Sequence, residues 1–154
     1  MSDSLKLRIA AGEPLVGTWV KTPSPMVCEV LGATELDLVC LDAEHSPFDR
    51  LVQDQCLHAL RAAGMPALVR VPAANHEYIL NALDCGAAGV VVPHVTSAQM
   101  AADVARSAHF GAGGRGYAGS TRAAHYTGKA MPDHLHDSAA QTVVIAQIED
   151  LEAL

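Results

Sequence analysis

Short apolar runs alternate along this chain with segments whose apolar residues recur at helical spacing. The runs are rich in Val, Leu and Ile, and neighbouring positions within a run are both apolar. Strands that are apolar on both faces are typical of parallel sheets covered by helices. The pattern predicts strands over residues 15–20, 36–41, 66–71, 88–92 and 142–148.

The segments between these runs carry the signals of helix ends. Ser24 before Pro25 is typical of an N-cap followed by the first helical residue, and Asn75 is a second N-cap candidate. Gly64 and Gly86 fit the position just beyond a helix, where the backbone is left-handed. The predicted helices cover residues 25–32, 49–63, 76–84, 97–109 and 132–140, and another begins at residue 150.

These elements form a β-α unit repeated five times in one predicted domain, residues 1–154. An open doubly wound sheet and a (β/α)8 barrel both fit such a repeat. No G-x-G-x-x-G follows the first strand, as it would in a dinucleotide-binding open sheet. Polar residues instead follow several of the strands, which is typical of barrels. A complete barrel takes about 250 residues, more than this chain has. We therefore predict an α/β protein of (β/α)8 TIM-barrel type, shortened to about its first five units.

Composition narrows the possible partners and location. Half of the 154 residues are hydrophobic and the formal net charge is −7, so a nucleic-acid partner, which needs a basic face, is not expected. No run reaches the roughly 18 apolar residues of a membrane span, and no signal peptide is recognisable. The four cysteines form no C-x-x-C pair, which argues against a zinc or redox site and favours the reducing cytoplasm.

Candidate chemistry begins directly after the second predicted strand, at Asp42-Ala43-Glu44-His45. Asp42 and His45 are three residues apart, so the carboxylate could orient the imidazole. A histidine titrates near pH 6.5 when unperturbed, about where proton transfer at neutral pH requires it. The alternative is a loop of solvated polar residues with a helix cap.

Two further strand ends carry charge. Arg70 interrupts an apolar strand, where a guanidinium is costly to bury unless it meets an anion. We predict that it binds a carboxylate or an enolate oxygen through its planar fork, with a structural ion pair at the rim as the alternative. Glu149 is a candidate ligand for Mg²⁺ or Mn²⁺, or else an N-cap. Gln147 lies on the same face and could hydrogen-bond a bound water.

Other polar segments are harder to assign. In the Gly-rich loop over residues 111–126, Arg115 and Arg122 could contact an anionic substrate or simply lie on a flexible rim. His134 and His136 are close in sequence, but at a helix start we expect them to face solvent rather than bind a metal. Five further histidines show no informative spacing: His58, His76, His94, His109 and His125.

Six short motifs occur in a fixed order along the chain. They are G-T-W, L-D-x-E-H, V-R-V-P, V-V-P-H, R-G-Y…T-R-A-A-x-Y and Q-I-E-D. Together, from Gly17 to the last residue, they resemble the HpcH/HpaI aldolases, relatives of the citrate lyase β subunits. Members of that family are (β/α)8 barrels, usually trimers or hexamers, that cleave 4-hydroxy-2-oxo acids to pyruvate and an aldehyde. The resemblance implies a cytoplasmic homo-oligomer acting as a metal-dependent pyruvate aldolase, a carbon–carbon lyase.

The resemblance also implies a role for each matched position. Glu149 would bind the divalent metal, Mg²⁺ or Mn²⁺ with Co²⁺ as a further candidate, which chelates pyruvate. Arg70 would stabilise the enolate oxygen that develops during cleavage. His45, oriented by Asp42, would move protons to and from the substrate hydroxyl. The substrate-binding residues would be Arg70, Gln147, which supports metal-bound water, and Trp19, which walls the pocket.

A Schiff-base mechanism is disfavoured by the lysines. A class I aldolase needs a lysine at the mouth of the barrel, and only Lys6, Lys21 and Lys129 are present. None of them ends an apolar strand cleanly, although Lys21 comes nearest. The metal mechanism is therefore preferred.

Full-length members of the family carry a second metal carboxylate on strand six, beyond the end of this chain at Leu154. One interpretation is a shortened aldolase. A second is a catalytically inactive truncated remnant that acts only through association with itself or a longer homologue. A third, ranked last, is a different, phosphate-binding barrel enzyme that uses the Gly-rich loop.

Overall fold

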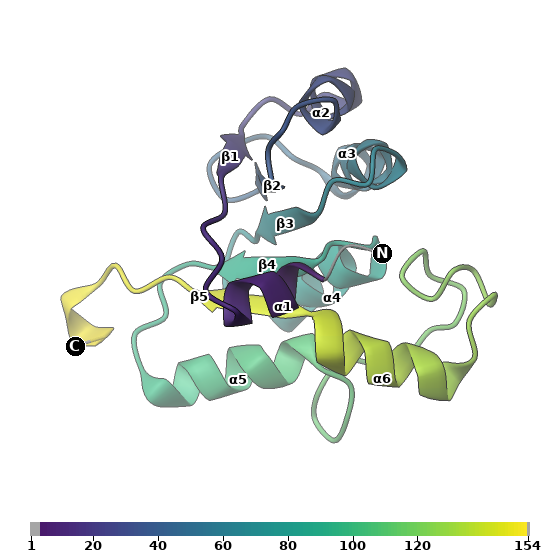
Figure 1. Ribbon diagram of the computed structural model, residues 1–154. Helices are drawn as coiled ribbons and strands as arrows, with labels where there is room; N and C mark the ends of the chain where they lie inside the picture. The colour runs from purple at the N-terminus through teal and green to yellow at the C-terminus, as the bar shows by residue number, and fades with distance from the viewer. Residues whose placement is uncertain (1–3, 154) are drawn as a thin grey trace.

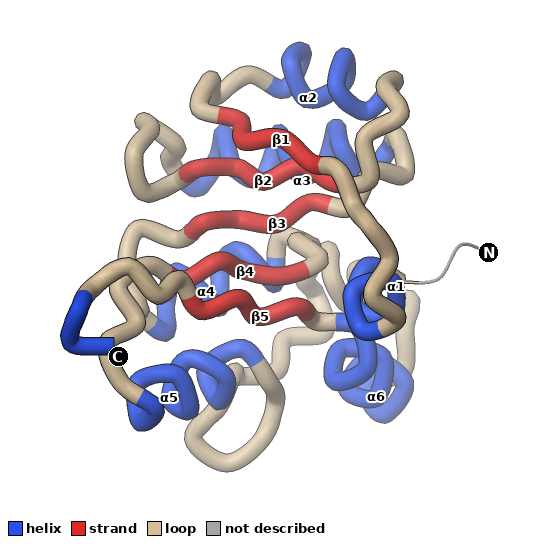
Figure 2. Tube along the Cα trace, turned by 60° about the vertical axis from the view of Figure 1, so that its left-hand side comes forward, coloured by secondary structure: helices blue, strands red, loops and turns tan. Residues whose placement is uncertain are grey.

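A parallel sheet of five strands forms the centre of the computed structural model, which describes residues 4–153. The strands lie side by side in sequence order (Figure 2). A doubly wound sheet reverses its strand order at a switch point, whereas a barrel wall does not, so this order confirms a sheet of (β/α)8 type. The strands are β1 (Gly17–Val20), β2 (Leu38–Asp42), β3 (Ala67–Arg70), β4 (Gly89–Val92) and β5 (Val143–Ala146).

Helices follow the strands and pack on one face of the sheet. Four of them contribute to a shared core with that face: α2 (Pro25–Gly32), α3 (Arg50–Ala62), α4 (His76–Asp84) and α5 (Ala98–Ala108). A long loop then leads to α6 (Met131–Gln141), and the 3-10 helix η1 (Leu151–Ala153) follows β5 (Figure 1). Within residues 4–153, none of the helices has the length and apolar character that a membrane crossing requires.

The predicted strands and helices are present, and most of their end signals are confirmed. The Asn75 side chain accepts a hydrogen bond at 2.7 Å from a backbone N–H in the first turn of α4. Gly64 and Gly86 are left-handed, with φ of +74° and +95°. Ser24 precedes α2 and Pro25 opens it, but the Ser24 side chain makes no capping hydrogen bond.

One helix, α1 (Leu5–Ala10), has no counterpart among the predicted elements. Its six residues are fewer than two turns, too short to show helical periodicity. Ser4 caps it, Leu5 is buried, and the Lys6 ammonium donates to the Ala139 carbonyl of α6 at 3.0 Å. These contacts hold α1 beside α6 at the amino edge of the sheet (Figure 1).

Both faces of the sheet are apolar, as the sequence pattern predicts. On β2, Val39 and Leu41 belong to the large core beneath the helices. Cys40 points the other way, into a smaller cluster with Leu68 and Val91. Side chains alternate along a strand, so residues two positions apart lie on the same face. Asp42 at the end of β2 and Arg70 at the end of β3 therefore share this second face with Cys40 and Leu68.

The core beneath the helices should dominate the stability of the fold. Leu60 on α3 is completely buried, whereas Leu51 on the same helix is 65% exposed. We expect Leu60→Ala to lower the free energy of unfolding by about 2–5 kcal/mol, because it removes buried methyl groups and leaves a cavity. Leu51→Ala should change it by less than about 0.5 kcal/mol. Urea denaturation of both variants measures the difference, and equal effects would contradict this account of the core.

Candidate active site

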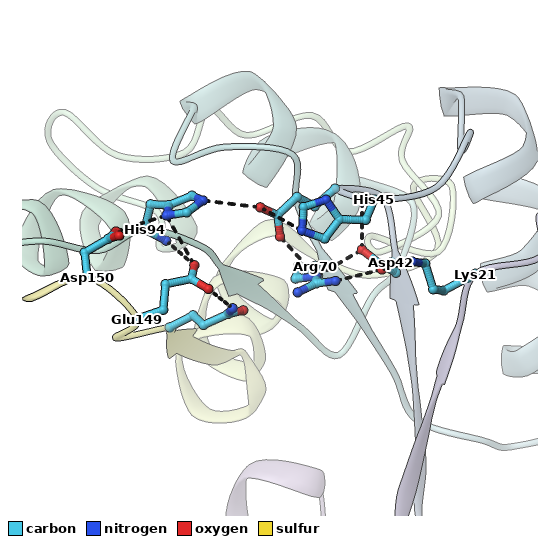
Figure 3. Close-up of polar contacts among 9 residues, drawn as sticks. Lys21, Asp42, His45, Arg70, His94, Glu149 and Asp150 are labelled. Carbon is cyan, nitrogen blue, oxygen red and sulfur yellow. Dashed lines mark hydrogen bonds and ion pairs between the residues drawn. The ribbon is translucent and has the colours of Figure 1, made fainter.

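Polar side chains gather at the carboxyl edge of the sheet (Figure 3). Asp42 ends β2 and Arg70 ends β3, and the register places them side by side. Arg70 donates from Nε to Asp42 Oδ1 at 3.0 Å and from Nη2 to Oδ2 at 2.7 Å. The Asp42 side chain is 1% exposed and that of Arg70 is 14% exposed, so the two form a buried, bidentate ion pair.

This pair is ionised at neutral pH. Burial by itself raises the pKa of Asp42, but hydrogen bonds from Arg70 and from the His45 backbone outweigh burial, and the net effect lowers that pKa. The hydrogen bond to Asp42 raises the pKa of Arg70. Arg70 was expected to bind an anion, and the anion that it binds in this structure is the Asp42 carboxylate.

Three further side chains surround the pair. The Arg70 guanidinium carbon lies 4.6 Å from the ring centroid of Trp19, within cation–π range. Lys21 Nζ lies 4.0 Å from Asp42 Oδ2, and Glu44 Oε2 lies 3.2 Å from Arg70 Nε. Packing against β1 and the loop after β2 thus fixes the orientation of the guanidinium plane.

The expected contact between the Asp42 carboxylate and the His45 imidazole is not formed. Asp42 instead accepts the backbone N–H of His45 at 3.1 Å. The His45 ring is largely exposed, with its Nε2 at 3.6 Å from Glu44 Oε1. The reason is that Asp42 still belongs to β2 and turns inward to Arg70, so that it fixes the backbone of the loop while Glu44 is the carboxylate nearest the ring.

A second group of polar side chains lies where β4 and β5 end. Glu149 Oε1 accepts the backbone N–H of His94 at 3.0 Å, and its Oε2 accepts from Gln147 Nε2 at 2.6 Å. The His94 ring completes the group, with Nδ1 at 3.0 Å from Asp150 Oδ2. The contact between Gln147 and Glu149 agrees with the prediction that they share a face.

Glu44 joins the two groups. Its Oε1 lies 3.6 Å from Nε2 of both His45 and His94, and its Oε2 faces Arg70. Through Glu44 and His94, the Arg70 guanidinium is connected to the Glu149 carboxylate. Side chains from the ends of β2 and β3 and from the loops after β2, β4 and β5 therefore meet at one edge of the sheet.

The sequence assigned no role to two members of this site, Glu44 and His94, although both stand in the quoted motifs L-D-x-E-H and V-V-P-H. His94 showed no spacing signal, yet it follows β4 directly after Pro93, so the strand-end rule that selected Arg70 also applies to it. Its backbone is left-handed, with φ of +53°. The hydrogen bond to Asp150, together with the nearby Glu149 and Glu44 carboxylates, raises the pKa of the ring above its ordinary value.

The carboxylates at this edge fit a hard divalent cation. Glu44 Oε2 is buried and accepts no hydrogen bond from residues 4–153, and its one charged neighbour there is Arg70 Nε at 3.2 Å, so it keeps lone pairs for a cation. No ready-made cage of three or more His, Cys, Asp or Glu side chains exists within that same range. Mg²⁺ does not need one, because it is commonly held by one or two carboxylates with water and substrate as its other ligands.

The remaining candidates from the sequence lie elsewhere. Arg122 pairs with Asp54 of α3 at 2.7 Å, and Arg115 is buried at the amino edge of the sheet. His134 was expected to face solvent, and that prediction is wrong. The residue is only 5% exposed, and its ring packs against the Phe110 ring with 5.4 Å between the centroids.

Known proteins resemble this chain in sequence. A sequence profile of the HpcH/HpaI aldolase/citrate lyase family matches residues 15–154. The chain is 33% identical to a hydroxypyruvate/pyruvate aldolase of Paraburkholderia phytofirmans and covers 61% of that protein. It is 34% identical to a 4-hydroxy-2-oxovalerate aldolase of Rhodococcus jostii and covers 58% of it. Each of these two alignments includes 99% of this chain.

Solved structures agree with the sequence comparison. An HpcH/HpaI aldolase/citrate lyase family protein from Burkholderia cenocepacia superposes with a TM-score of 0.89 at 35% identity. That match includes 99% of this chain and 62% of the other. The chain thus spans about three fifths of the length of these relatives. On sequence and fold together, the chain belongs to the HpcH/HpaI aldolase/citrate lyase family.

Proposed function

We propose that the site at the carboxyl edge catalyses metal-dependent cleavage of a 4-hydroxy-2-oxo acid to pyruvate and an aldehyde. The observation that carries the proposal is a guanidinium fixed by a buried carboxylate, next to further carboxylates from neighbouring strand ends. The relatives named as hydroxypyruvate/pyruvate and 4-hydroxy-2-oxovalerate aldolases support this substrate class. A homo-oligomer in the cytoplasm remains part of the prediction.

Arg70 is the residue proposed to stabilise negative charge. Cleavage of the bond between C3 and C4 leaves an enolate on the pyruvate fragment, and its oxygen gains charge as the bond breaks. A guanidinium already held in place by Asp42 and Trp19 needs no reorganisation to receive that charge. Two of its nitrogens donate to Asp42, and Nη1 makes no hydrogen bond within residues 4–153.

His45 is the residue proposed to move protons. Its ring is 60% exposed, so a bound substrate can reach it, and Glu44 Oε1 lies 3.6 Å from Nε2. An imidazole in this position can act as a general base and take the proton of the 4-hydroxyl as the carbon–carbon bond breaks. Asp42 supports this role through the His45 backbone, and Glu44 is the carboxylate that faces the ring.

Glu149 is proposed to hold the divalent metal, Mg²⁺ or Mn²⁺ or Co²⁺, together with water and substrate. When bound, the metal would polarise the 2-oxo group and add positive charge where the enolate develops. Gln147 and the His94 backbone fix the Glu149 carboxylate from both sides. These hydrogen bonds lower the pKa of Glu149 and keep it ionised as a ligand. Trp19, which stacks on the Arg70 guanidinium, is proposed to form a wall of the substrate site.

An enzymatic assay tests the proposal. Pyruvate release from 4-hydroxy-2-oxovalerate is expected in the presence of Mg²⁺ or Mn²⁺ and should disappear with excess chelator. His45→Gln should lower the rate by about 10²–10⁴-fold, because it removes the proposed general base. The control is His58→Gln, an exposed histidine on α3, which should leave the rate unchanged.

Two outcomes would contradict these assignments. A His45→Gln variant with the full rate would remove His45 from the mechanism. A folded chain that releases no pyruvate with any of the three metals would contradict catalysis by this chain and favour the inactive alternative. Circular dichroism of the same preparation separates that result from a failure to fold.

A further inference from the structure

A second polar cavity lies at the amino edge of the sheet, opposite the proposed active site. Its volume is about 420 Å³, within the range of small-molecule sites. The residues that precede β3, β4 and β5 form its floor, among them Pro66, Ala87 and Thr142. Helices α3 and α6 and the loop after α5 complete its walls.

Cations outnumber carboxylates in the lining of this cavity. Arg61, Arg115 and Lys129 all contribute, whereas Asp137 is the single carboxylate among the lining residues that the structure describes. Asp137 is already paired with Lys129. The cavity therefore carries net positive charge in a protein whose formal net charge is −7.

Arg115 is the most unusual of these residues. Its side chain is 2% exposed, and within residues 4–153 its Nε has no hydrogen-bond partner. The nearest carboxylate oxygen, Asp84 Oδ1, lies 3.5 Å from Nε without forming a hydrogen bond. The guanidinium stacks on Phe110, 4.1 Å from the ring centroid. Leaving a buried charged group unsatisfied is costly, so an external anion here would relieve an existing penalty.

The electrostatics of this pair reflect its burial. Burial raises the pKa of Asp84 above its ordinary value, and the nearby Arg115 offsets that rise only in part. Burial likewise lowers the pKa of Arg115. Both shifts have the direction expected for a cation whose anionic partner is inadequate.

Arg61 supplies a second guanidinium to the cavity. Its Nη1 donates to the Arg122 carbonyl at 3.2 Å, and its Nη2 lies 3.4 Å from His125 Nδ1. It forms no ion pair with a carboxylate in the part of the chain that the structure describes. The nearby Arg122, by contrast, is neutralised by Asp54. Arg61 and Arg115 thus offer planar guanidinium donors to the same cavity.

We propose that this cavity binds the phosphate group of a small molecule through Arg61 and Arg115. A phosphate carries nearly two negative charges and three strong acceptor oxygens, which matches two guanidinium groups better than a carboxylate does. The cavity is larger than a phosphate alone, and the buried Leu57 and Leu83 in its lining provide an apolar wall for an organic part. The site shares no residue with the carboxyl edge, so it does not depend on the aldolase proposal.

Isothermal titration calorimetry of the purified chain tests this site, with inorganic phosphate, glycerol 3-phosphate and acetate as separate probes at constant ionic strength. Saturable binding of one phosphate probe per chain is expected, with acetate at least about tenfold weaker. Arg61→Gln should weaken phosphate binding by about 10–100-fold, the effect of losing a charge-assisted hydrogen bond. Tighter binding of glycerol 3-phosphate would identify the ligand of this cavity as an organic phosphate. Tighter binding of inorganic phosphate would identify it as the free ion.

The matched control is Arg50→Gln, which removes the same charge from the exposed first residue of α3. It should leave the affinity unchanged. Arg115→Gln should abolish binding, and Arg61→Gln decides the question if that buried variant does not fold. Absence of saturable phosphate binding, equal affinity for acetate, or equal losses in Arg50→Gln and Arg61→Gln would each overturn the proposal.

Discussion

Arg70→Leu is expected to lower the free energy of unfolding by about 3–5 kcal/mol, the usual effect of removing one partner from a buried ion pair. The Asp42 carboxylate, only 1% exposed, would lose both of its guanidinium hydrogen bonds. Lys21 cannot replace them, because its ammonium already lies 4.0 Å away on a side chain that is 61% exposed. Urea denaturation at pH 7 measures the loss.

Two further variants define the origin of this effect. Adding Asp42→Asn to Arg70→Leu should recover much of the stability, because the orphaned charge is gone. Arg50→Leu, which removes an exposed arginine, should stay within about 0.5 kcal/mol of the wild type. If Arg70→Leu proves as stable as the Arg50 variant, the pair does not support the fold.

The pH dependence provides an independent check. Because the pKa of Asp42 is lowered in the folded state, its contribution to stability is present above the ordinary aspartate pKa of about 3.9 and is lost as the pH falls toward the folded-state value. The stability difference between wild type and Arg70→Leu should therefore shrink as the pH falls below about 4. A difference that stays constant down to acid pH would show that lost packing, not the unpaired carboxylate, destabilises the variant.

The gathering of Asp42, Arg70 and Glu149 at one edge was predictable from the sequence. Each follows an apolar run, and the carboxyl ends of parallel strands lie at the same edge of a sheet. Strand order was predictable for the same reason, since each short β-α connection places the next strand beside the last. The apolar cores on both faces likewise follow from strands that have no polar face.

Side-chain partners within the site were not predictable in the same way. Spacing alone favoured Asp42 as the partner of the His45 ring, but the direction of each side chain depends on where β2 ends. Because the strand includes Asp42, that carboxylate points inward to Arg70, and Glu44 is left beside the ring. His94 has no informative spacing from another histidine, and only its position directly after β4 marks it as a member of the site.

The Gly-rich loop shows a third limit. Arg115 lies between glycines, which in sequence indicates a flexible rim, yet its side chain is buried against Phe110. The Phe110 ring is itself packed against His134 of α6, and Asp84 at the end of α4 lies 3.5 Å from Arg115 Nε. Because α4 and α6 are separated from this part of the loop in the sequence, the glycine pattern does not predict the burial of Arg115.

Arg70→Lys should lower kcat/KM for pyruvate release by about 10²–10³-fold, the usual effect of removing one well-placed donor to a developing oxyanion. Lysine keeps a positive charge near Asp42 but has no planar fork, so it cannot hold both Asp42 oxygens and also present a donor to the substrate. The loss should appear mainly in kcat, because the enolate charge exists only as the bond breaks.

Lysine is the informative substitution because leucine or alanine would expose the stability role of Arg70 at the same time. With Lys at this position, the stability loss should be clearly smaller than that of Arg70→Leu, since Asp42 keeps a cation within reach. Steady-state kinetics with Mg²⁺, together with urea denaturation of the same preparation, separates the two effects. A variant with the full rate would show that a simple point charge is sufficient, and the guanidinium fork would then serve the fold and not the reaction.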